Sequence, residues 1–194
     1  MNHIGTQYIE TERLILRRFE LSDAPAMFVN WASDDEVTKF LTWPTHADVS
    51  VTEGILGEWV PQYGDDHYYN WAIVLKEHGP EPVGNINVHS PKPVGNINVA
   101  HWHEGGSIPE IGYCMGKRWW HQGIMSEALG AVLDFLFDQV GVERIVAEHD
   151  TNNPHSGGVM RKCGMAFDGV REKAGKNNQG VVDMARYTLK ASDR

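Results

Sequence analysis

The segment from Arg118 to Ala128 combines a glycine-containing turn with the start of a helix, an arrangement that can bind phosphate. An extended apolar stretch, residues 111–115, leads into it. Where a strand leads into a helix, several backbone N–H groups at the helix start lack partners, and the helix dipole adds positive potential there. We therefore predict an anion site in this turn, where a pyrophosphate could sit. A single glycine in such a turn also serves many ordinary bends.

The helix that follows the turn is well marked in the sequence. Gly141 stands where a glycine at the C-terminal cap is expected. Apolar residues recur between the turn and this glycine at helical spacing: Ala128, Leu129, Val132, Leu133, Leu136 and Phe137.

Four motifs spread over the chain extend the pattern around the turn. They are TERLILR at residues 11–17, EIGY at 110–113, NNPHS at 152–156 and KCGMAFDG at 162–169. Their order and spacing resemble those of the GNAT acyltransferases. Within that family, the chain resembles the branch that includes the ribosomal-protein N-terminal acetyltransferases (RimJ/RimL-like).

The resemblance implies an α/β fold, with a mixed central β-sheet, helices on both faces and two central parallel strands that splay apart. These strands would be residues 111–115 and 144–149, and a thioester would lie in the opening. The family's central turn has an Arg or Gln, two further residues, a Gly, one residue, and a Gly or Ala. Arg118 and Gly123 match this pattern, whereas His121 replaces the first glycine and narrows the approach to the backbone.

The resemblance also implies that acetyl-CoA is the acyl donor and that no metal is required. Backbone groups of the turn would hold its pyrophosphate, and residues 111–115 would lie along its pantetheine arm. The predicted cofactor-binding residues are Ile111, Gly112, Tyr113, Cys114, Met115, Arg118, His121, Gln122, Gly123, Ile124, Met125, Ser126, Glu127, Asn153 and Ser156.

Direct acetyl transfer needs a proton donor for the departing thiolate. In enzymes similar to this chain, the positions of Asn153 and Ser156 contact the cofactor arm or its thiol, so Ser156 is the predicted donor. The alternative is that Asn153, before Pro154, caps a helix and that Ser156 serves only its first turn.

The acceptor side requires a neutral amine. Glu110 is the predicted catalytic base, directly or through water, because it starts the strand that faces the thioester; a solvent-exposed glutamate at a strand end is the alternative. Tyr113 could line the same slot. Trp43 is the predicted acceptor-site aromatic residue, since the N-terminal helical region usually covers the acceptor in GNAT folds.

Two rival constellations point to other chemistry. His101 and His103 alternate on one strand face, with His89 nearby, and could share a metal, but no cysteine pair or carboxylate set completes such a site. His149-Asp150 with Ser156 suggests a hydrolytic triad, but the sequence lacks a nucleophile elbow.

The acidic composition of the chain limits the classes of ligand that it is expected to bind. The formal net charge of −9 argues against nucleic acid as the main ligand, since phosphate binding needs clustered lysine and arginine. A cationic amine or a basic protein fits better, although acidity also serves solubility.

No apolar run approaches a membrane span and no signal peptide is evident, so a cytoplasmic protein is expected. The two cysteines, Cys114 and Cys163, suit reduced thiols.

The 194 residues suit one domain, 1–194, and leave a homodimer open. Expected strands cover residues 14–19, 68–75, 108–115, 144–149, 166–172 and 181–189. Besides the helix after the turn, helices are expected from Ser22-Asp23 to about Trp31, over 34–41 and from 49 to 63, where Pro61 and Gly64 end the last one.

An 11-residue tandem duplication interrupts this order. Residues 82–88 and 93–99 both read PVGNINV, and each copy could fill the same strand. The second copy has the family-like distance to Glu110. We expect one copy to be surplus, extending an edge hairpin or loop around His89-Ser90-Pro91, after the turn at Gly79-Pro80.

Taken together, these features predict an acetyl-CoA-dependent N-acetyltransferase acting on a primary amine, with a protein N-terminus as the expected acceptor. A small-molecule amine, such as a polyamine or an aminoglycoside, is the alternative acceptor. A non-catalytic acyl-CoA-binding module is the alternative from another class.

Overall fold

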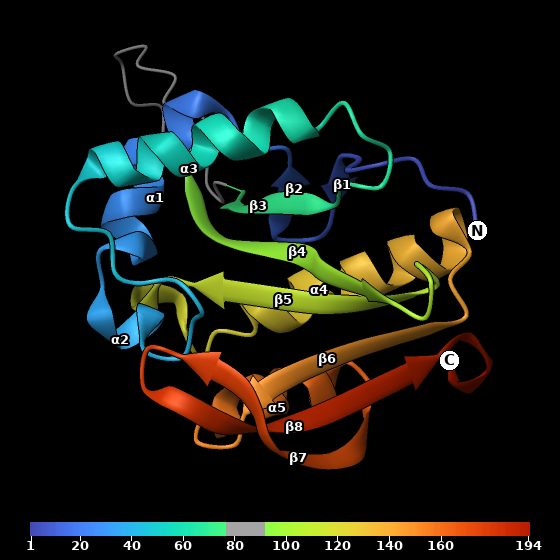
Figure 1. The fold of residues 1–194 in the computed structure, drawn as a ribbon. Coiled ribbons are helices and arrows are strands. Elements are labelled where there is room, and N and C mark those ends of the chain that lie inside the picture. The colour runs from blue at the N-terminus through green and yellow to red at the C-terminus, as the bar shows by residue number, and fades with distance from the viewer. Residues whose placement is uncertain (77–91) are drawn as a thin grey trace.

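The computed structural model describes residues 1–76 and 92–194. Within these residues, eight strands form one sheet in the order β1-β2-β3-β4-β5-β6-β8-β7 (Figure 1). All described neighbours are antiparallel except β5 and β6, which are parallel. The strands are β1 (Ile9–Glu10), β2 (Leu14–Arg17), β3 (Asn70–Leu75), β4 (Pro93–His103), β5 (Ile108–Met115), β6 (Arg144–Asp150), β7 (Ala166–Asn177) and β8 (Gly180–Lys190).

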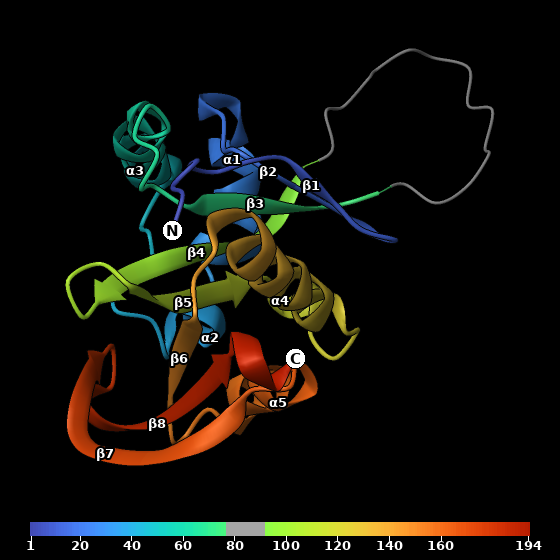
Figure 2. The same ribbon diagram turned by 90° about the vertical axis from the view of Figure 1, so that its right-hand side faces the viewer.

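Helices cover both faces of the sheet, as expected (Figures 1 and 2). On one face lie α1 (Ala24–Met27), which continues through a wider turn at Phe28–Ala32, α2 (Asp35–Thr38) and α3 (Val49–Gln62). On the other lie α4 (Ile124–Phe135), which continues through Leu136–Val140, and α5 (Pro154–Lys162). No helix in the described part of the chain is long and apolar enough to cross a membrane.

Two apolar clusters hold these layers together because successive strand residues point to opposite faces. On β3, Trp71 and Ile73 pack into the larger cluster, beneath α4. Ala72, between them, packs into the smaller cluster with Met27 of α1 and Leu56 of α3. The alternating burial of β3 therefore fixes α1–α3 on one face and α4–α5 on the other.

The central parallel strands separate soon after they meet. In the described structure, pairing between β5 and β6 is confined to Glu110↔Val146 and Ile111↔Ala147. Beyond these pairs, β5 stays paired with β4 on its other side, as far as Met115. The remaining peptide groups of β5 on the β6 side are therefore left without a strand partner, which confirms the predicted splay.

The second copy of the duplicated sequence forms the first part of β4. It pairs with β3 on one side and with β5 on the other, with Ile97 opposite Trp71 and Tyr113. The first copy lies outside the described residues, as do the predicted turn at Gly79-Pro80 and the predicted hairpin or loop around His89-Ser90-Pro91. The structure therefore assigns this strand to residues 93–99.

Strand β7 runs further than its sequence indicated, whereas α3 ends close to its predicted end. Strand β7 continues to Asn177 rather than ending near residue 172, and its side chains are mostly exposed. Its polar sequence does not show the period of two, but its backbone pairs with β8 from Ala166 to Asn177, with breaks in the register after Phe167 and after Arg171. Helix α3 includes Pro61 in its last turn, one residue before its end at Gln62.

Candidate active site

The predicted anion site is a turn in which the backbone twice adopts a left-handed conformation. After the short 3-10 turn Lys117–Trp119, His121 has φ 60° and Gly123 has φ 75°, and α4 begins at Ile124. Gly123 is the N-cap residue, without a side chain to satisfy the first N–H groups of α4. These groups and the helix dipole are therefore available to an anion.

Two cations from distant parts of the chain meet at this turn. A Cβ atom on Gly123 would lie 3.4 Å from Lys162 Nζ, at the end of α5, and 3.5 Å from Arg13 Nη2, before β2. Arg13 also donates a hydrogen bond of 3.0 Å to the carbonyl oxygen of Gln122. Neither cation was predicted, because only the tertiary fold brings them to the turn.

Glu127 ties α4 to the N-terminal segment. Its carboxylate accepts hydrogen bonds from Thr11 Oγ1 at 2.6 Å, from Arg13 N at 2.9 Å and from Arg13 Nε at 2.6 Å. Burial opposes ionisation of Glu127, but these hydrogen bonds and the Arg13 charge outweigh it and lower the pKa of the carboxyl. The side chain of Glu127 therefore holds the turn in place.

His121, which replaces a family glycine, is exposed and contacts the first turn of α5. Its ring meets the ring of His155 edge-on, with 4.8 Å between the centroids. Arg118 is exposed as well, and its guanidinium lies over the Trp119 ring, 5.8 Å from the centroid.

Ser156 and Tyr113 lie together on the α4–α5 side of the splay. Ser156 Oγ donates a hydrogen bond of 3.0 Å to the Tyr113 hydroxyl, which donates one of 2.9 Å to the Ser156 carbonyl oxygen. Burial raises the pKa of Tyr113. Asn153 precedes α5 without a side-chain cap, so capping does not account for its side chain. The structure thus brings three predicted site residues to the edge of the opening.

Glu110 lies on the opposite face of β5. Alternation places it on the same face as Cys114, which packs with the α1–α3 cluster. The side chain of Glu110 is 25% exposed and forms a hydrogen bond of 2.6 Å with His103 Nε2. This strand-end glutamate is therefore partly exposed to solvent and also has a hydrogen-bond partner.

Both cysteines are free thiols in the structure. Burial raises the pKa of Cys114 to about 12 and that of Cys163 to about 11. Cys114 Sγ donates to Asn96 Oδ1 at 2.8 Å. At neutral pH neither thiol ionises appreciably, so neither is suited to be a nucleophile.

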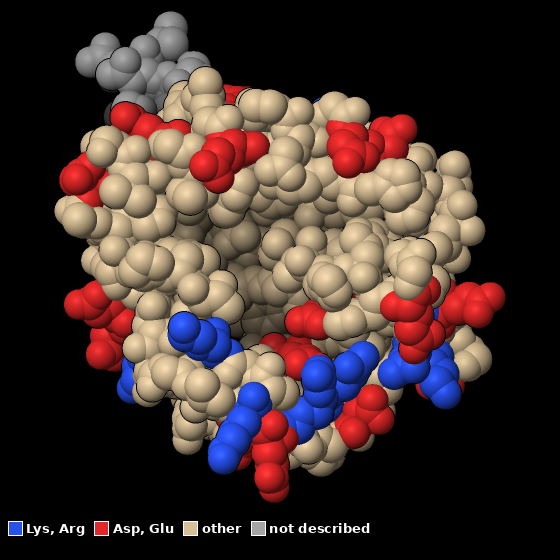
Figure 3. Space-filling model, viewed as in Figure 1, with Lys and Arg blue, Asp and Glu red and all other residues tan. Residues whose placement is uncertain are grey.

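A deep hollow opens over the middle of the sheet on the face that carries α1–α3 (Figure 3). It lies between α3 above and the β7–β8 hairpin below, with acidic side chains along its edge and lysine or arginine side chains below it (Figure 3). This is the face on which Glu110 lies. Ser156 and the anion turn lie on the other side of the sheet, the side that carries α4 and α5.

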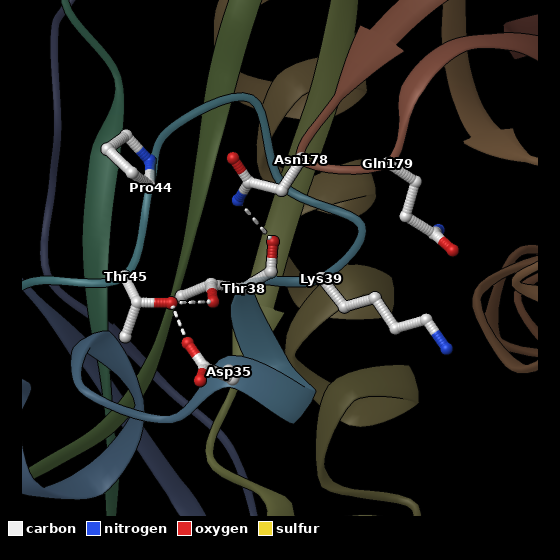
Figure 4. Close-up of a pocket in the computed structure, with 7 residues that line it drawn as sticks. All are labelled: Asp35, Thr38, Lys39, Pro44, Thr45, Asn178 and Gln179. Atoms are coloured by element: carbon white, nitrogen blue, oxygen red, sulfur yellow. Dashed lines mark hydrogen bonds between the residues drawn. The ribbon is translucent and has the colours of Figure 1, made fainter.

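The β7–β8 turn is tied to the segment between α2 and α3. Asn178 Nδ2 donates to the carbonyl oxygens of Thr38 at 2.9 Å and Trp43 at 2.8 Å. Beside this tie is an open cavity of about 410 Å³ (Figure 4). Its lining residues are Asp35, Thr38, Lys39, Pro44, Thr45, Asn178 and Gln179.

Trp43, the predicted acceptor-site aromatic residue, is half-buried. Its ring lies 5.1 Å from the ring of His46, centroid to centroid, and packs against the α1–α3 cluster. Much of this side chain is therefore used for packing beside the tie.

Neither rival constellation is complete among the residues that the structure describes. Among residues 1–76 and 92–194, no group of three or more His, Cys, Asp or Glu side chains could hold a metal ion, and His89 lies outside these ranges. His149 Nδ1 donates to the backbone carbonyl of Asp150 at 2.7 Å. Since Ser156 donates to Tyr113 instead, the hydrolytic triad is not formed.

Comparisons with known proteins agree with this geometry. The family model for the acetyltransferase (GNAT) domain matches residues 13–166. A relative from Bacillus licheniformis, described as "uncharacterized N-acetyltransferase p20", is 27% identical over 179 residues, which cover 92% of this chain and 93% of the relative.

Two solved structures share the fold. RimL, a ribosomal L7/L12 alpha-N-protein acetyltransferase in complex with coenzyme A, has a TM-score of 0.79 and 18% identity, covering 97% of this chain and 100% of that one. The microcin C7 self-immunity acetyltransferase MccE, in complex with acetyl-CoA and AMP, has a TM-score of 0.76 and 18% identity, covering 93% of each chain. With the family model matching most of its length, the chain belongs to the GNAT acetyltransferase family and is an acyltransferase.

Proposed function

We propose that this enzyme transfers the acetyl group of acetyl-CoA directly to a primary amine, with a protein N-terminus as the acceptor. The observation that carries the proposal is the splay between β5 and β6, with the anion turn and Ser156 on one side of the sheet and Glu110 and the hollow on the other. If the thioester lies in that opening, the groups proposed to bind the cofactor and protonate its thiolate would be on one side of the sheet. The proposed base for the amine would be on the other side.

The anion turn suits the pyrophosphate of acetyl-CoA. The free N–H groups at the start of α4 would hold it, and the positive charges of Arg13 and Lys162 would neutralise it. The unpaired peptide groups of β5 would hold the pantetheine arm and offer an N–H to the thioester carbonyl. RimL and MccE, which share the fold, bind coenzyme A and acetyl-CoA, respectively.

The reaction needs two proton transfers. Glu110 would remove the proton of the ammonium group, directly or through water, so that the free amine attacks the thioester carbonyl carbon. As the C–S bond breaks, Ser156 would give its hydroxyl proton to the thiolate and take up the second amine proton, so that its hydroxyl is restored. The Tyr113 hydroxyl accepts a hydrogen bond from Ser156 and would orient that side chain.

A protein N-terminus suits the site because an α-amine has a pKa of about 7.7–8.0 and needs only modest help to lose its proton. RimL is an alpha-N-protein acetyltransferase of ribosomal L7/L12, whereas MccE is a microcin C7 self-immunity acetyltransferase. A small-molecule amine is therefore the second candidate acceptor, and the acidic surface suits either cation. A non-catalytic acyl-CoA-binding module is the alternative from another class, but membership of the acetyltransferase family favours an enzyme.

The test is thiol release from acetyl-CoA by the purified protein, with N-terminal peptides, polyamines and aminoglycosides as separate acceptor sets. We expect release with N-terminal peptides, and a loss of turnover in Ser156→Ala and Glu110→Gln with acetyl-CoA binding retained. Ser107→Ala, in the exposed β4–β5 turn, is the matched control. Release only with polyamines or aminoglycosides would favour the second acceptor class, and binding without release would favour the binding module.

A further inference from the structure

His103 and Glu110 form an isolated acid–imidazole pair on the hollow side of the sheet. They belong to the antiparallel strands β4 and β5, and His103 Nε2 lies 2.6 Å from Glu110 Oε2. Trp102, between His101 and His103, packs into the cluster beneath α4. Both histidines therefore project to the opposite face, the one that carries Glu110.

The position of the pair relates it to the proposed reaction. Glu110 is in the first of the two residue pairs that join β5 to β6, and the strands separate directly after the second, Ile111↔Ala147. Its carboxylate therefore lies at the entrance of the opening in which the thioester would sit. The side chains of His103 and Glu110 are 28% and 25% exposed, so the pair also reaches solvent.

Stability gives little reason for the pair. Partly exposed ion pairs typically contribute no more than about 1 kcal/mol, and the β4–β5 hairpin is already held by backbone pairing. The ring of His101 meets that of His103 edge-on, with centroids 4.5 Å apart, but no described hydrogen bond joins His101 to Glu110. His103 is thus the imidazole through which a proton on Glu110 could reach solvent.

We propose that His103 is a positioning and proton-relay residue for Glu110, which rests on the proposed function of this site. The Glu110 carboxylate takes one proton from the acceptor ammonium, and the imidazole of His103 passes one proton from the pair to solvent. The second amine proton follows the departing thiolate. Each turnover therefore consumes one ammonium and one acetyl-CoA and yields the amide, free CoA and one solvent proton.

The experiment compares His103→Gln, His103→Leu and the control His101→Gln by steady-state kinetics. Glutamine can still donate a hydrogen bond to Glu110 but cannot carry a proton, whereas leucine can do neither. Two peptide acceptors of one scaffold are used, one with an α-amine and one with a more basic N-terminal amine. Acetyl-CoA binding is measured for each variant by titration calorimetry.

We expect His103→Gln and His103→Leu to lower kcat by about tenfold or more with the basic amine, and by less with the α-amine, since general-base catalysis contributes about 10²–10⁴-fold. Acetyl-CoA affinity should stay unchanged, as should turnover in His101→Gln. The double variant, with both His103→Gln and Glu110→Gln, should have about the same kcat as Glu110→Gln alone, because the two residues act as one unit.

Three results would overturn the inference. Wild-type turnover in both His103 variants would show that the pair has no part in the reaction. Full turnover in His103→Gln with loss in His103→Leu would show that a hydrogen bond to Glu110 suffices and that no relay operates. A wild-type protein inactive with every acceptor would remove the proposed function and the relay with it, which distinguishes that failure from the first two.

Discussion

A single carboxylate, that of Glu127, holds the anion turn against the N-terminal segment. It accepts three hydrogen bonds, from Thr11 and from two groups of Arg13. Arg13 in turn contacts the carbonyl oxygen of Gln122 and approaches Gly123. The position of a cation beside the turn therefore depends on Glu127.

We expect Glu127→Gln to lower the free energy of unfolding by about 1–3 kcal/mol at pH 7, because charged hydrogen bonds of a mostly buried group are lost. The folded-state pKa of Glu127 is lowered, so its contribution is complete above the unfolded-state pKa of about 4.3 and is lost as the pH falls through the folded-state value. Urea unfolding of both proteins between pH 7 and pH 3 checks this. A difference that grows as the pH falls would contradict it.

His121 has a strained backbone conformation, and its side chain narrows the approach of a ligand to the turn. A non-glycine residue at φ 60° is disfavoured because its Cβ crowds the backbone. We expect His121→Gly to raise the free energy of unfolding by about 0.5–1 kcal/mol, less than the strain itself because glycine also loosens the unfolded chain.

Gly123→Ala is the matched control for His121→Gly. It places a Cβ at φ 75° and within 3.5 Å of both Lys162 Nζ and Arg13 Nη2, so its stability should change in the opposite direction. Urea unfolding of the two variants measures both effects. A destabilised His121→Gly protein would mean that the contact with His155 outweighs the strain.

At the scale of elements, the sequence predicts those whose apolar residues repeat with a clear period. Strand β5 matches its predicted bounds of residues 108–115, and Gly141 ends the helical segment after α4 at φ 78°, as predicted. The polar end of β7 was missed because pairing with β8, rather than an apolar face, holds it.

The same limit applies to the site. Ser156, Glu110 and the turn at residues 118–127 were found because they lie within motifs of consecutive residues. Arg13, Lys162 and His103 also lie within sequence patterns, but those patterns do not show that their side chains meet the site, because only tertiary contacts bring them there. The motifs therefore indicate the type of chemistry, whereas the charged residues that contact the site are identified only from the three-dimensional structure.

The β7–β8 turn is tied by Asn178 to the segment that follows α2. We expect Asn178→Ala to raise the KM for the amine acceptor by about three- to tenfold, with the KM for acetyl-CoA unchanged, because two hydrogen bonds that position the turn are lost. Gln179→Ala, in the same turn and lining the same cavity, is the control. An equal effect in both variants, or none in Asn178→Ala, would count against this role of the tie.

For the whole molecule, the described structure builds one continuous sheet with only the second PVGNINV copy. That copy supplies the residues of β4 that pair with both β3 and β5, so removing it exposes two strand edges unless the first copy takes its place. The single-domain organisation over residues 1–194 stays a prediction.

Deleting residues 82–92 removes one copy of the repeat and leaves residues 76–81 to connect β3 to β4. Six residues are enough to join adjacent antiparallel strands, since connections of about 4–6 residues are common. We therefore expect the deletion protein to be soluble, to unfold cooperatively and to bind acetyl-CoA with wild-type affinity by calorimetry. Deleting Pro93–Val99 instead should prevent folding if the register of β4 is set by these particular residues. If that deletion protein folds equally well, the two copies are interchangeable, and the strand is defined by the repeated sequence rather than by its position in the chain.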